Sequence, residues 1–155
     1  MAVEIERKFL VINDKWRDNI LSESIIKQGY IANQENATVR VRVARDSAWL
    51  NIKGATRGIR RAEFEYPIPL EDAEAILLQV AQQPYISKTR YKVKCGNHIW
   101  DLDLFDGENQ GLVMAEVELS DEREPFEMPE WAGEEVSGDP RYYNASLVKN
   151  PYTAW

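Results

Sequence analysis

Hydrophobic and polar residues alternate along most of this chain with a period of two, which is typical of β-strands that have two different faces. The alternation predicts eight strands, at residues 3–12, 24–32, 37–45, 48–54, 60–68, 85–95, 97–105 and 113–120. A helical period is clear only over residues 70–82, where apolar side chains form one stripe. Shorter helices are predicted over residues 15–21, capped by Asp14, and over residues 142–149.

Strands joined by short connections favour an antiparallel β-barrel or a strongly curved sheet, with the helices packed outside it. The expected fold class is therefore α+β. We expect one domain over residues 1–155, with the barrel strands within residues 2–120 and a turn and helix segment over residues 129–155.

The polar face of nearly every predicted strand carries charged residues, and their signs are sorted by strand. Acidic pairs two residues apart are Glu4 and Glu6, Glu63 and Glu65, Asp101 and Asp103, and Glu116 and Glu118; the basic pairs are Arg40 and Arg42, and Lys88 and Arg90.

Like charges on one strand face repel each other unless a counter-ion lies between them. A divalent metal would explain the acidic pairs, because Mg²⁺ and Mn²⁺ prefer carboxylate oxygens. A polyphosphate would explain the basic pairs. The alternative is that these faces are simply exposed to water. We favour a charged cavity, because water-facing strands usually contain more Thr, Ser and Gln.

Composition narrows the class of protein further. The formal net charge of −7 argues against general nucleic-acid binding through a basic surface, but it permits a local basic cluster for a small polyanion. No apolar run approaches the roughly 20 residues that cross a membrane, and we see no signal peptide. Cys95 is the only cysteine and His98 the only histidine, so we expect no internal disulfide, no histidine-cluster zinc site and a cytoplasmic location.

The motif Glu-x-Glu-x-Lys at Glu4, Glu6 and Lys8 resembles the signature of the CYTH superfamily, the triphosphate tunnel metalloenzymes. A lone match would be weak, but further motifs follow in the family's order. These are RVR at residues 40–42, NIKG at 51–54, EFE at 63–65, KTR at 88–90, DLD at 101–103 and EVE at 116–118, and the tail GDPRYYNASL resembles the ending of short bacterial members.

The resemblance implies an eight-stranded antiparallel barrel that encloses a small-molecule triphosphate and one or two Mg²⁺ or Mn²⁺ ions. It implies metal ligands at Glu4, Glu6, Glu116, Glu118 and Asp103 or Asp101, and phosphate contacts from Lys8, Arg40, Arg42, Lys53, Lys88 and Arg90. Catalytic roles would fall to Glu4, Lys8, Tyr30, Glu63 and Glu65. Tyr30 resembles a tyrosine that pairs with the motif lysine, or else it is a packed barrel aromatic.

The function expected first is metal-dependent hydrolysis of inorganic tripolyphosphate, because a chain this short leaves little to build a pocket for an organic group. The alternatives are a class IV adenylate cyclase or a thiamine or nucleoside triphosphatase in the same tunnel, and a non-catalytic polyphosphate-binding module. Trp131 and Trp155 would serve a homodimer interface if they are exposed, although such residues more often pack locally.

Overall fold

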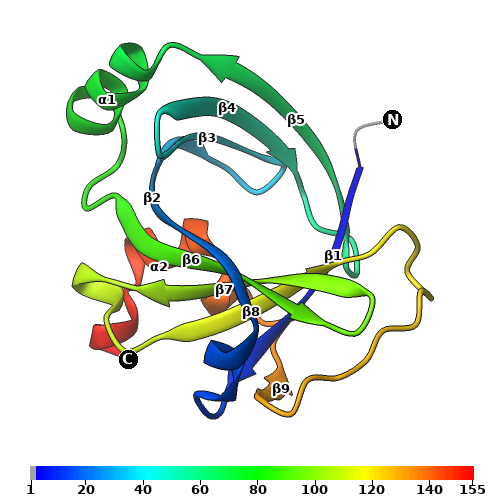
Figure 1. The fold of residues 1–155 in the computed structure, drawn as a ribbon. Helices are drawn as coiled ribbons and strands as arrows, with labels where there is room; N and C mark the ends of the chain where they lie inside the picture. Colours follow the sequence, from blue (N-terminus) through cyan, green and yellow to red (C-terminus); the bar gives the residue numbers. More distant parts are fainter. Residues whose placement is uncertain (1–2) are drawn as a thin grey trace.

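The structure, a computed structural model, describes residues 3–155 and is organised around a closed antiparallel β-barrel (Figure 1). The strands are β1 (Val3–Val11), β2 (Ile20–Asn33), β3 (Ala37–Ala44), β4 (Ser47–Gly54), β5 (Arg60–Ile68), β6 (Ile86–Cys95), β7 (His98–Phe105), β8 (Val113–Glu118) and β9 (Ala132–Glu135). Eight of them follow the order β5-β4-β3-β2-β6-β7-β8-β1, and pairing of β5 with β1 closes the ring. The predicted eight-stranded barrel is confirmed; residue 2, where we expected it to begin, lies outside the described residues.

Strand β1 closes the barrel by pairing with β8 along one edge and with short stretches of β5 and β9 along the other. Its first half pairs with residues 60–62 of β5, and the Glu6 N–H donates to the carbonyl of Ile59 at 3.2 Å. Its second half pairs with β9, where the Val136 N–H donates to the carbonyl of Lys8 at 2.8 Å. We did not predict β9, because its short sequence lies among turn-forming residues and has no alternating pattern.

The predicted strand boundaries are close to the observed ones, with one clear exception. Strand β2 begins at Ile20 rather than at residue 24, because its early part pairs with β6 from Ile20 to Gln28. The predicted tight turn between β6 and β7 is present, and Gly96 has a φ of +59° there. Glycine adopts this left-handed conformation without the steric penalty that a Cβ would impose.

The helices are α1 (Leu70–Gln79) and α2 (Asn144–Lys149), and the short 3₁₀ turns are η1 (Lys15–Asn19), η2 (Gly107–Asn109), η3 (Pro140–Tyr142) and η4 (Tyr152–Ala154). Helix α1 ends three residues before the predicted residue 82, because the Gln82 N–H instead donates to the carbonyl of Tyr30 on β2. The predicted Asp14 cap is wrong: the side-chain oxygen of Asn13 accepts from the Lys15 N–H at 3.0 Å. None of the helices within residues 3–155 has the length and apolar character needed to cross a membrane.

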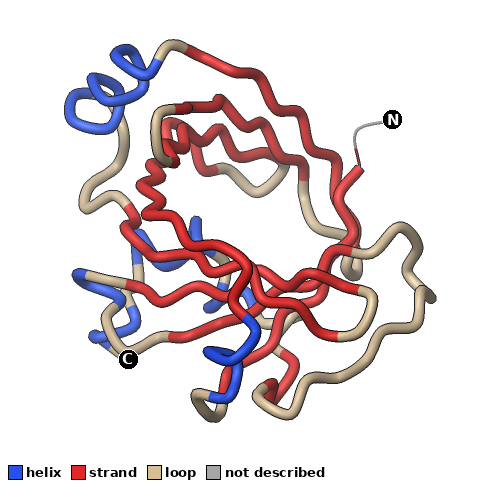
Figure 2. The backbone as a smooth tube through the Cα atoms, viewed as in Figure 1, coloured by secondary structure: helices blue, strands red, loops and turns tan. Residues whose placement is uncertain are grey.

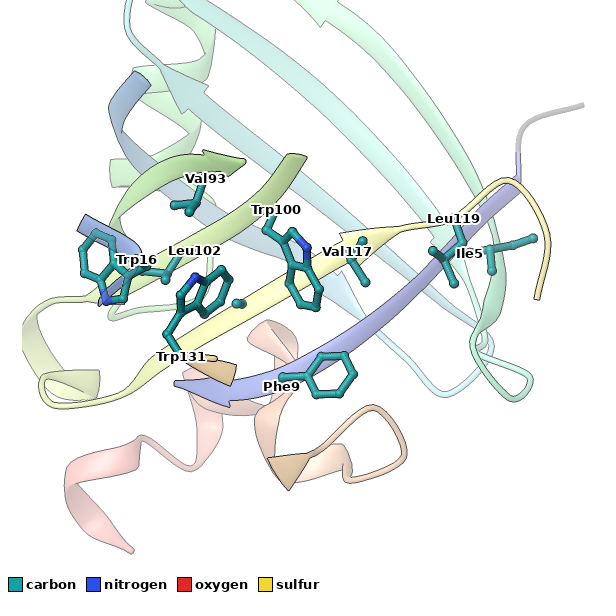
Figure 3. Close-up of a cluster of buried hydrophobic side chains, with 10 residues drawn as sticks. Ile5, Phe9, Trp16, Val93, Trp100, Leu102, Val117, Leu119 and Trp131 are labelled. Atoms are coloured by element: carbon teal, nitrogen blue, oxygen red, sulfur yellow. The ribbon is translucent and has the colours of Figure 1, made fainter. Parts of the chain in front are cut away.

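The largest hydrophobic core lies outside the barrel wall, which reverses the usual arrangement of a small barrel. Figure 3 shows Phe9, Trp16, Trp100 and Trp131 gathered against the outer faces of the strands. Trp100 and Trp131 meet edge to face with ring centroids 5.4 Å apart. Each such buried side chain contributes about 1.5–3 kcal/mol of hydrophobic free energy. Trp131 is only 3% exposed, so it packs within the chain rather than at a dimer interface.

Two smaller hydrophobic clusters cover other parts of the barrel's outer surface. Helix α1 lies outside the ring of strands (Figure 2) and packs Ala73 and Leu77 against β3 and β4. The C-terminal segment, residues 137–155, packs Leu147 and Val148 near β6 and β8. The helices do not cover the whole outer face: Ile52, Phe64 and Tyr66 on β4 and β5 remain 36%, 46% and 52% exposed. A homodimer stays a prediction.

Candidate active site

The barrel encloses a cavity of about 510 Å³ whose lining is rich in charged side chains of both signs. The charges come from alternate positions of the strands, so the predicted charged faces do point inward. Nearly all of the predicted site residues line it: Glu4, Glu6, Lys8, Tyr30, Arg40, Arg42, Lys53, Glu63, Glu65, Lys88, Arg90, Glu116 and Glu118. Asp103 does not line the cavity, whereas Asp101 does.

Four glutamates on two neighbouring strands form the acidic side of the cavity. In the β1–β8 ladder, Glu6 lies opposite Glu118, and Lys8 lies opposite Glu116. Burial raises the pKa of Glu6 well above its ordinary value, and the charges of Glu116 and Glu4 raise it further. Burial also raises the pKa of Glu118, together with Glu4 and Asp101. Burial acts in the same direction on Glu4 and Glu116, but Lys53 and Lys8 outweigh it and lower the pKa of each. Glu6 and Glu118 are therefore the carboxylates with too little positive charge beside them.

A divalent cation is chemically suited to this acidic side, because it would remove the repulsion that raises the pKa of Glu6. Glu4, Glu6, Glu116 and Glu118 supply carboxylate oxygens, the ligand type that Mg²⁺ and Mn²⁺ prefer. Within residues 3–155, no three Asp, Glu, His or Cys side chains are already gathered closely enough to hold a metal ion. The residue types therefore fit a hard cation, and binding one would require the carboxylates to converge.

The basic side of the cavity contains cations that lack a sufficient counter-charge. The Nε atoms of Arg40 and Arg42 are buried and have no hydrogen-bond partner among residues 3–155. Burial lowers the pKa of Arg42 to about 10, with contributions from Arg40 and Arg90. Burial lowers the pKa of Lys53 to about 7, and Arg40 is the largest charge acting in the same direction. An anion bound here would relieve all of these unfavourable interactions.

Lys88 and Arg90 on β6 are held by Asp103 on the adjacent strand β7. Arg90 donates to both carboxylate oxygens of Asp103, at 2.8 and 3.0 Å, and Lys88 Nζ lies 2.9 Å from Oδ2. Burial by itself raises the pKa of Asp103, but Arg90 and Lys88 outweigh it and lower the pKa overall. Asp103, which we predicted to be a metal ligand, is thus positioned to orient two cations of the cavity. Its identity as an aspartate did not indicate this role.

The two sides meet at Glu4. Lys53 Nζ donates to Glu4 Oε2 at 3.1 Å, and Arg61 donates two hydrogen bonds of 3.2 Å to Glu4 Oε1. From the sequence we gave Arg61 no role in the site. Its position on the same face of the strand as Glu63 and Glu65 would have been enough to identify it as a cavity residue.

Glu63 and Glu65 on β5 lie among cations and an amide rather than with the other glutamates. Glu63 Oε2 is 3.2 Å from Lys53 Nζ. Glu65 Oε2 accepts a hydrogen bond of 2.8 Å from Asn51 and lies 3.4 Å from Arg42. In this geometry both residues orient basic side chains.

Lys8 faces the C-terminal segment. Its ammonium lies 3.4 Å from the carbonyl of Tyr142, 3.6 Å from Glu116 and 5.5 Å from the ring centre of Tyr143. Tyr30 lines the cavity, yet within residues 3–155 its hydroxyl makes no hydrogen bond to Lys8. The aromatic ring over the motif lysine is therefore that of Tyr143, which the sequence pattern did not single out.

The C-terminal segment also forms part of the cavity wall. The Lys8 N–H donates to Ser137 Oγ at 2.8 Å, and the Asn33 side chain on β2 donates to the carbonyl of Ala145 at 3.0 Å. The segment thus runs from β1 to β2 across one end of the barrel. Irregular chain of this kind has no periodicity, so its site residues could not be identified from the pattern of the sequence.

The sequence matches the CYTH domain family over residues 2–151. It is 47% identical over 152 residues to the inorganic triphosphatase of Acetivibrio thermocellus, covering 98% of this chain and 97% of that protein. It is 33% identical over 149 residues to the inorganic triphosphatase of Nitrosomonas europaea, covering 94% and 96% of the two chains.

Solved structures show the same fold. A crystal structure described as an inorganic triphosphatase superposes with a TM-score of 0.69 at 32% identity, covering 96% of this chain and 95% of that one. A Hippeastrum protein described as having a dominant triphosphatase activity shares the fold alone, with a TM-score of 0.56 at 11% identity and coverage of 76% and 80%. With a charged cavity inside the same closed barrel and a family match along almost its whole length, the chain belongs to the CYTH family.

Proposed function

We propose that this protein hydrolyses inorganic triphosphate to phosphate and diphosphate within its barrel cavity. The observation that carries the proposal is the buried guanidinium of Arg40, 8% exposed, whose Nε lacks any partner in residues 3–155. It lies in a cavity that also contains crowded carboxylates, so a polyanion and a cation are both needed to balance the charges. Relatives that share nearly the full length of the chain are named inorganic triphosphatases.

The basic side chains bind and orient the substrate. Arg40 and Arg42 offer guanidinium groups that contact phosphate oxygens through two parallel hydrogen bonds, while Lys8, Lys53 and Lys88 offer single charges. Phosphoryl transfer depends mainly on such positioning and on neutralising negative charge. Asp103 fixes Lys88 and Glu65 fixes Arg42 before the substrate arrives, which reduces the ordering required in the transition state.

The glutamates Glu4, Glu6, Glu116 and Glu118 would hold Mg²⁺ or Mn²⁺. Such an ion, when bound, neutralises phosphoryl charge and lowers the pKa of a bound water. Glu118 lines the cavity and forms no ion pair within residues 3–155, so we propose that its carboxylate oxygen that does not bind the ion accepts the proton of the attacking water. Glu4 and Glu63 fit that task less well because both contact Lys53.

The C-terminal segment favours an inorganic substrate over an organic one. Ser137, Tyr143 and Asn144 line the cavity, so the C-terminal segment occupies space at the end of the barrel that it crosses and leaves less room there for a nucleoside. A cyclase would need an adenosine site that holds the ribose 3′ oxygen beside the α-phosphate.

The test is a panel assay of the purified protein with Mg²⁺ or Mn²⁺ against tripolyphosphate, ATP, thiamine triphosphate and pyrophosphate. We expect phosphate release to be fastest from tripolyphosphate. An Arg40→Ala variant purified in the same way is the control, and its slower release of phosphate would exclude a contaminating phosphatase as the source of the activity. Conversion of ATP to cyclic AMP without release of phosphate would refute the proposal. Binding of tripolyphosphate without turnover under every metal condition would instead identify a binding module.

A further inference from the structure

We propose that Asn144, at the start of α2, is a positioning residue that fixes the ammonium of Lys88 for contact with a phosphate of the substrate. This inference rests on the proposed function, because it assigns Lys88 to phosphate binding. It gives the C-terminal segment a role in the basic side of the cavity beyond that of a cover.

The side-chain oxygen of Asn144 accepts two hydrogen bonds. Lys88 Nζ donates to it at 2.9 Å and Gln28 Nε2 donates to it at 2.6 Å. Gln28 and Lys88 are only 1% and 2% exposed. The Asn144 amide is therefore held from two sides, and its oxygen cannot turn away from Lys88 without leaving a buried donor unpaired.

The geometry at Lys88 shows what this contact achieves. An ammonium group has three donors, and here one donates to Asp103 Oδ2 at 2.9 Å and a second to Asn144. The third donor remains for the cavity that Lys88 lines. A lysine side chain loses considerable conformational entropy when it is immobilised, so holding it before the substrate arrives strengthens binding.

Asp103 alone would leave Lys88 under-constrained. Asp103 also receives both hydrogen bonds of Arg90, so its position is shared between two cations. Asn144 comes from a different part of the chain and supplies an uncharged acceptor, which orients Lys88 without neutralising it. This is why an amide, rather than a second carboxylate, suits a lysine that must attract an anion.

The test measures tripolyphosphate binding by calorimetry in EDTA, so that it does not depend on turnover. We expect Asn144→Ala to weaken binding by about 10-fold, the usual effect of losing a hydrogen bond to a charged group. In a Lys88→Met background the same substitution should change the dissociation constant by less than about 2-fold, because the two residues act as a coupled pair. Asn150→Ala, at the exposed C-terminal end of the same helix, is the matched control and should bind like the wild type.

Two results would overturn the inference. One is wild-type affinity in Asn144→Ala; the other is an equal loss with and without Lys88, which a general disturbance of the C-terminal segment would produce. A circular dichroism melt of each variant verifies folding. A wild-type protein that binds tripolyphosphate without hydrolysing it would contradict the proposed function and leave this inference standing.

Discussion

Binding of triphosphate should be accompanied by proton uptake near pH 8, and Lys53 should account for most of it. Burial and the neighbouring Arg40 lower the pKa of Lys53 to about 7, and burial lowers that of Lys88 to about 8. At pH 8 the free protein therefore has Lys53 about nine-tenths uncharged and Lys88 about half uncharged. An anion in the cavity favours the charged forms of both, so their pKa values rise when it binds.

The sign follows from these shifts. Binding can add a proton to Lys53 only at a pH at which Lys53 of the free protein has already lost it. For Lys53 this is above about pH 7. Below about pH 6 both lysines are already charged, and the contribution disappears. The wild type should take up about 0.9 proton more than a Lys53→Met variant at pH 8, and the affinity of the wild type should fall as the pH rises.

Calorimetric titration with tripolyphosphate in EDTA, in two buffers of different ionisation enthalpy, measures this uptake. Taking the difference between wild type and variant cancels the protons that the ligand itself exchanges. Lys149→Met, an exposed lysine outside the cavity lining, is the control and should match the wild type. Equal proton uptake in wild type and Lys53→Met at pH 8 would refute the reasoning, since it would mean that Lys53 is already charged in the empty cavity.

Three further predictions concern the acidic side, the basic side and the core. The pKa of Glu6 is higher in the folded state than in the unfolded state. The free energy of unfolding therefore falls as the pH rises from the ordinary pKa of a glutamate through the raised pKa of the folded state. Glu6→Gln should therefore raise the melting temperature more at pH 8 than at pH 5 and abolish hydrolysis; a lower melting temperature at pH 8 would give Glu6 a structural role. Arg40→Ala should raise KM for tripolyphosphate by about 10-fold or more in steady-state kinetics, and an unchanged KM would remove Arg40 from the phosphate contacts. Trp100→Ala should lower the free energy of unfolding by about 3–5 kcal/mol in urea titrations, and a loss below about 1 kcal/mol would contradict its place in the core.

Much of the barrel and its charged interior could be predicted because successive side chains of a strand point to opposite faces of the sheet. Glu4, Glu6 and Lys8 occupy every second position of β1, and the buried apolar residues Ile5 and Phe9 lie on the opposite face. This spacing places all three charged side chains in the cavity without knowledge of the rest of the fold. The same local rule separates Arg40 and Arg42 from Val39, Val41 and Val43 on the opposite face of β3. Strand boundaries were close to the observed ones for the same reason.

Contacts between distant segments were decided only by the tertiary structure. Asp103 resembled a metal ligand in its motif, yet it holds Lys88 and Arg90, because strand register and not sequence spacing determines which charges meet. The apposition of Tyr143 to Lys8 and of Asn144 to Lys88 depends on where an aperiodic tail folds back, and no local pattern encodes that path. Alternation within each strand thus determined which side chains face inward, whereas long-range packing decided which of them bind one another and which remain free for a substrate.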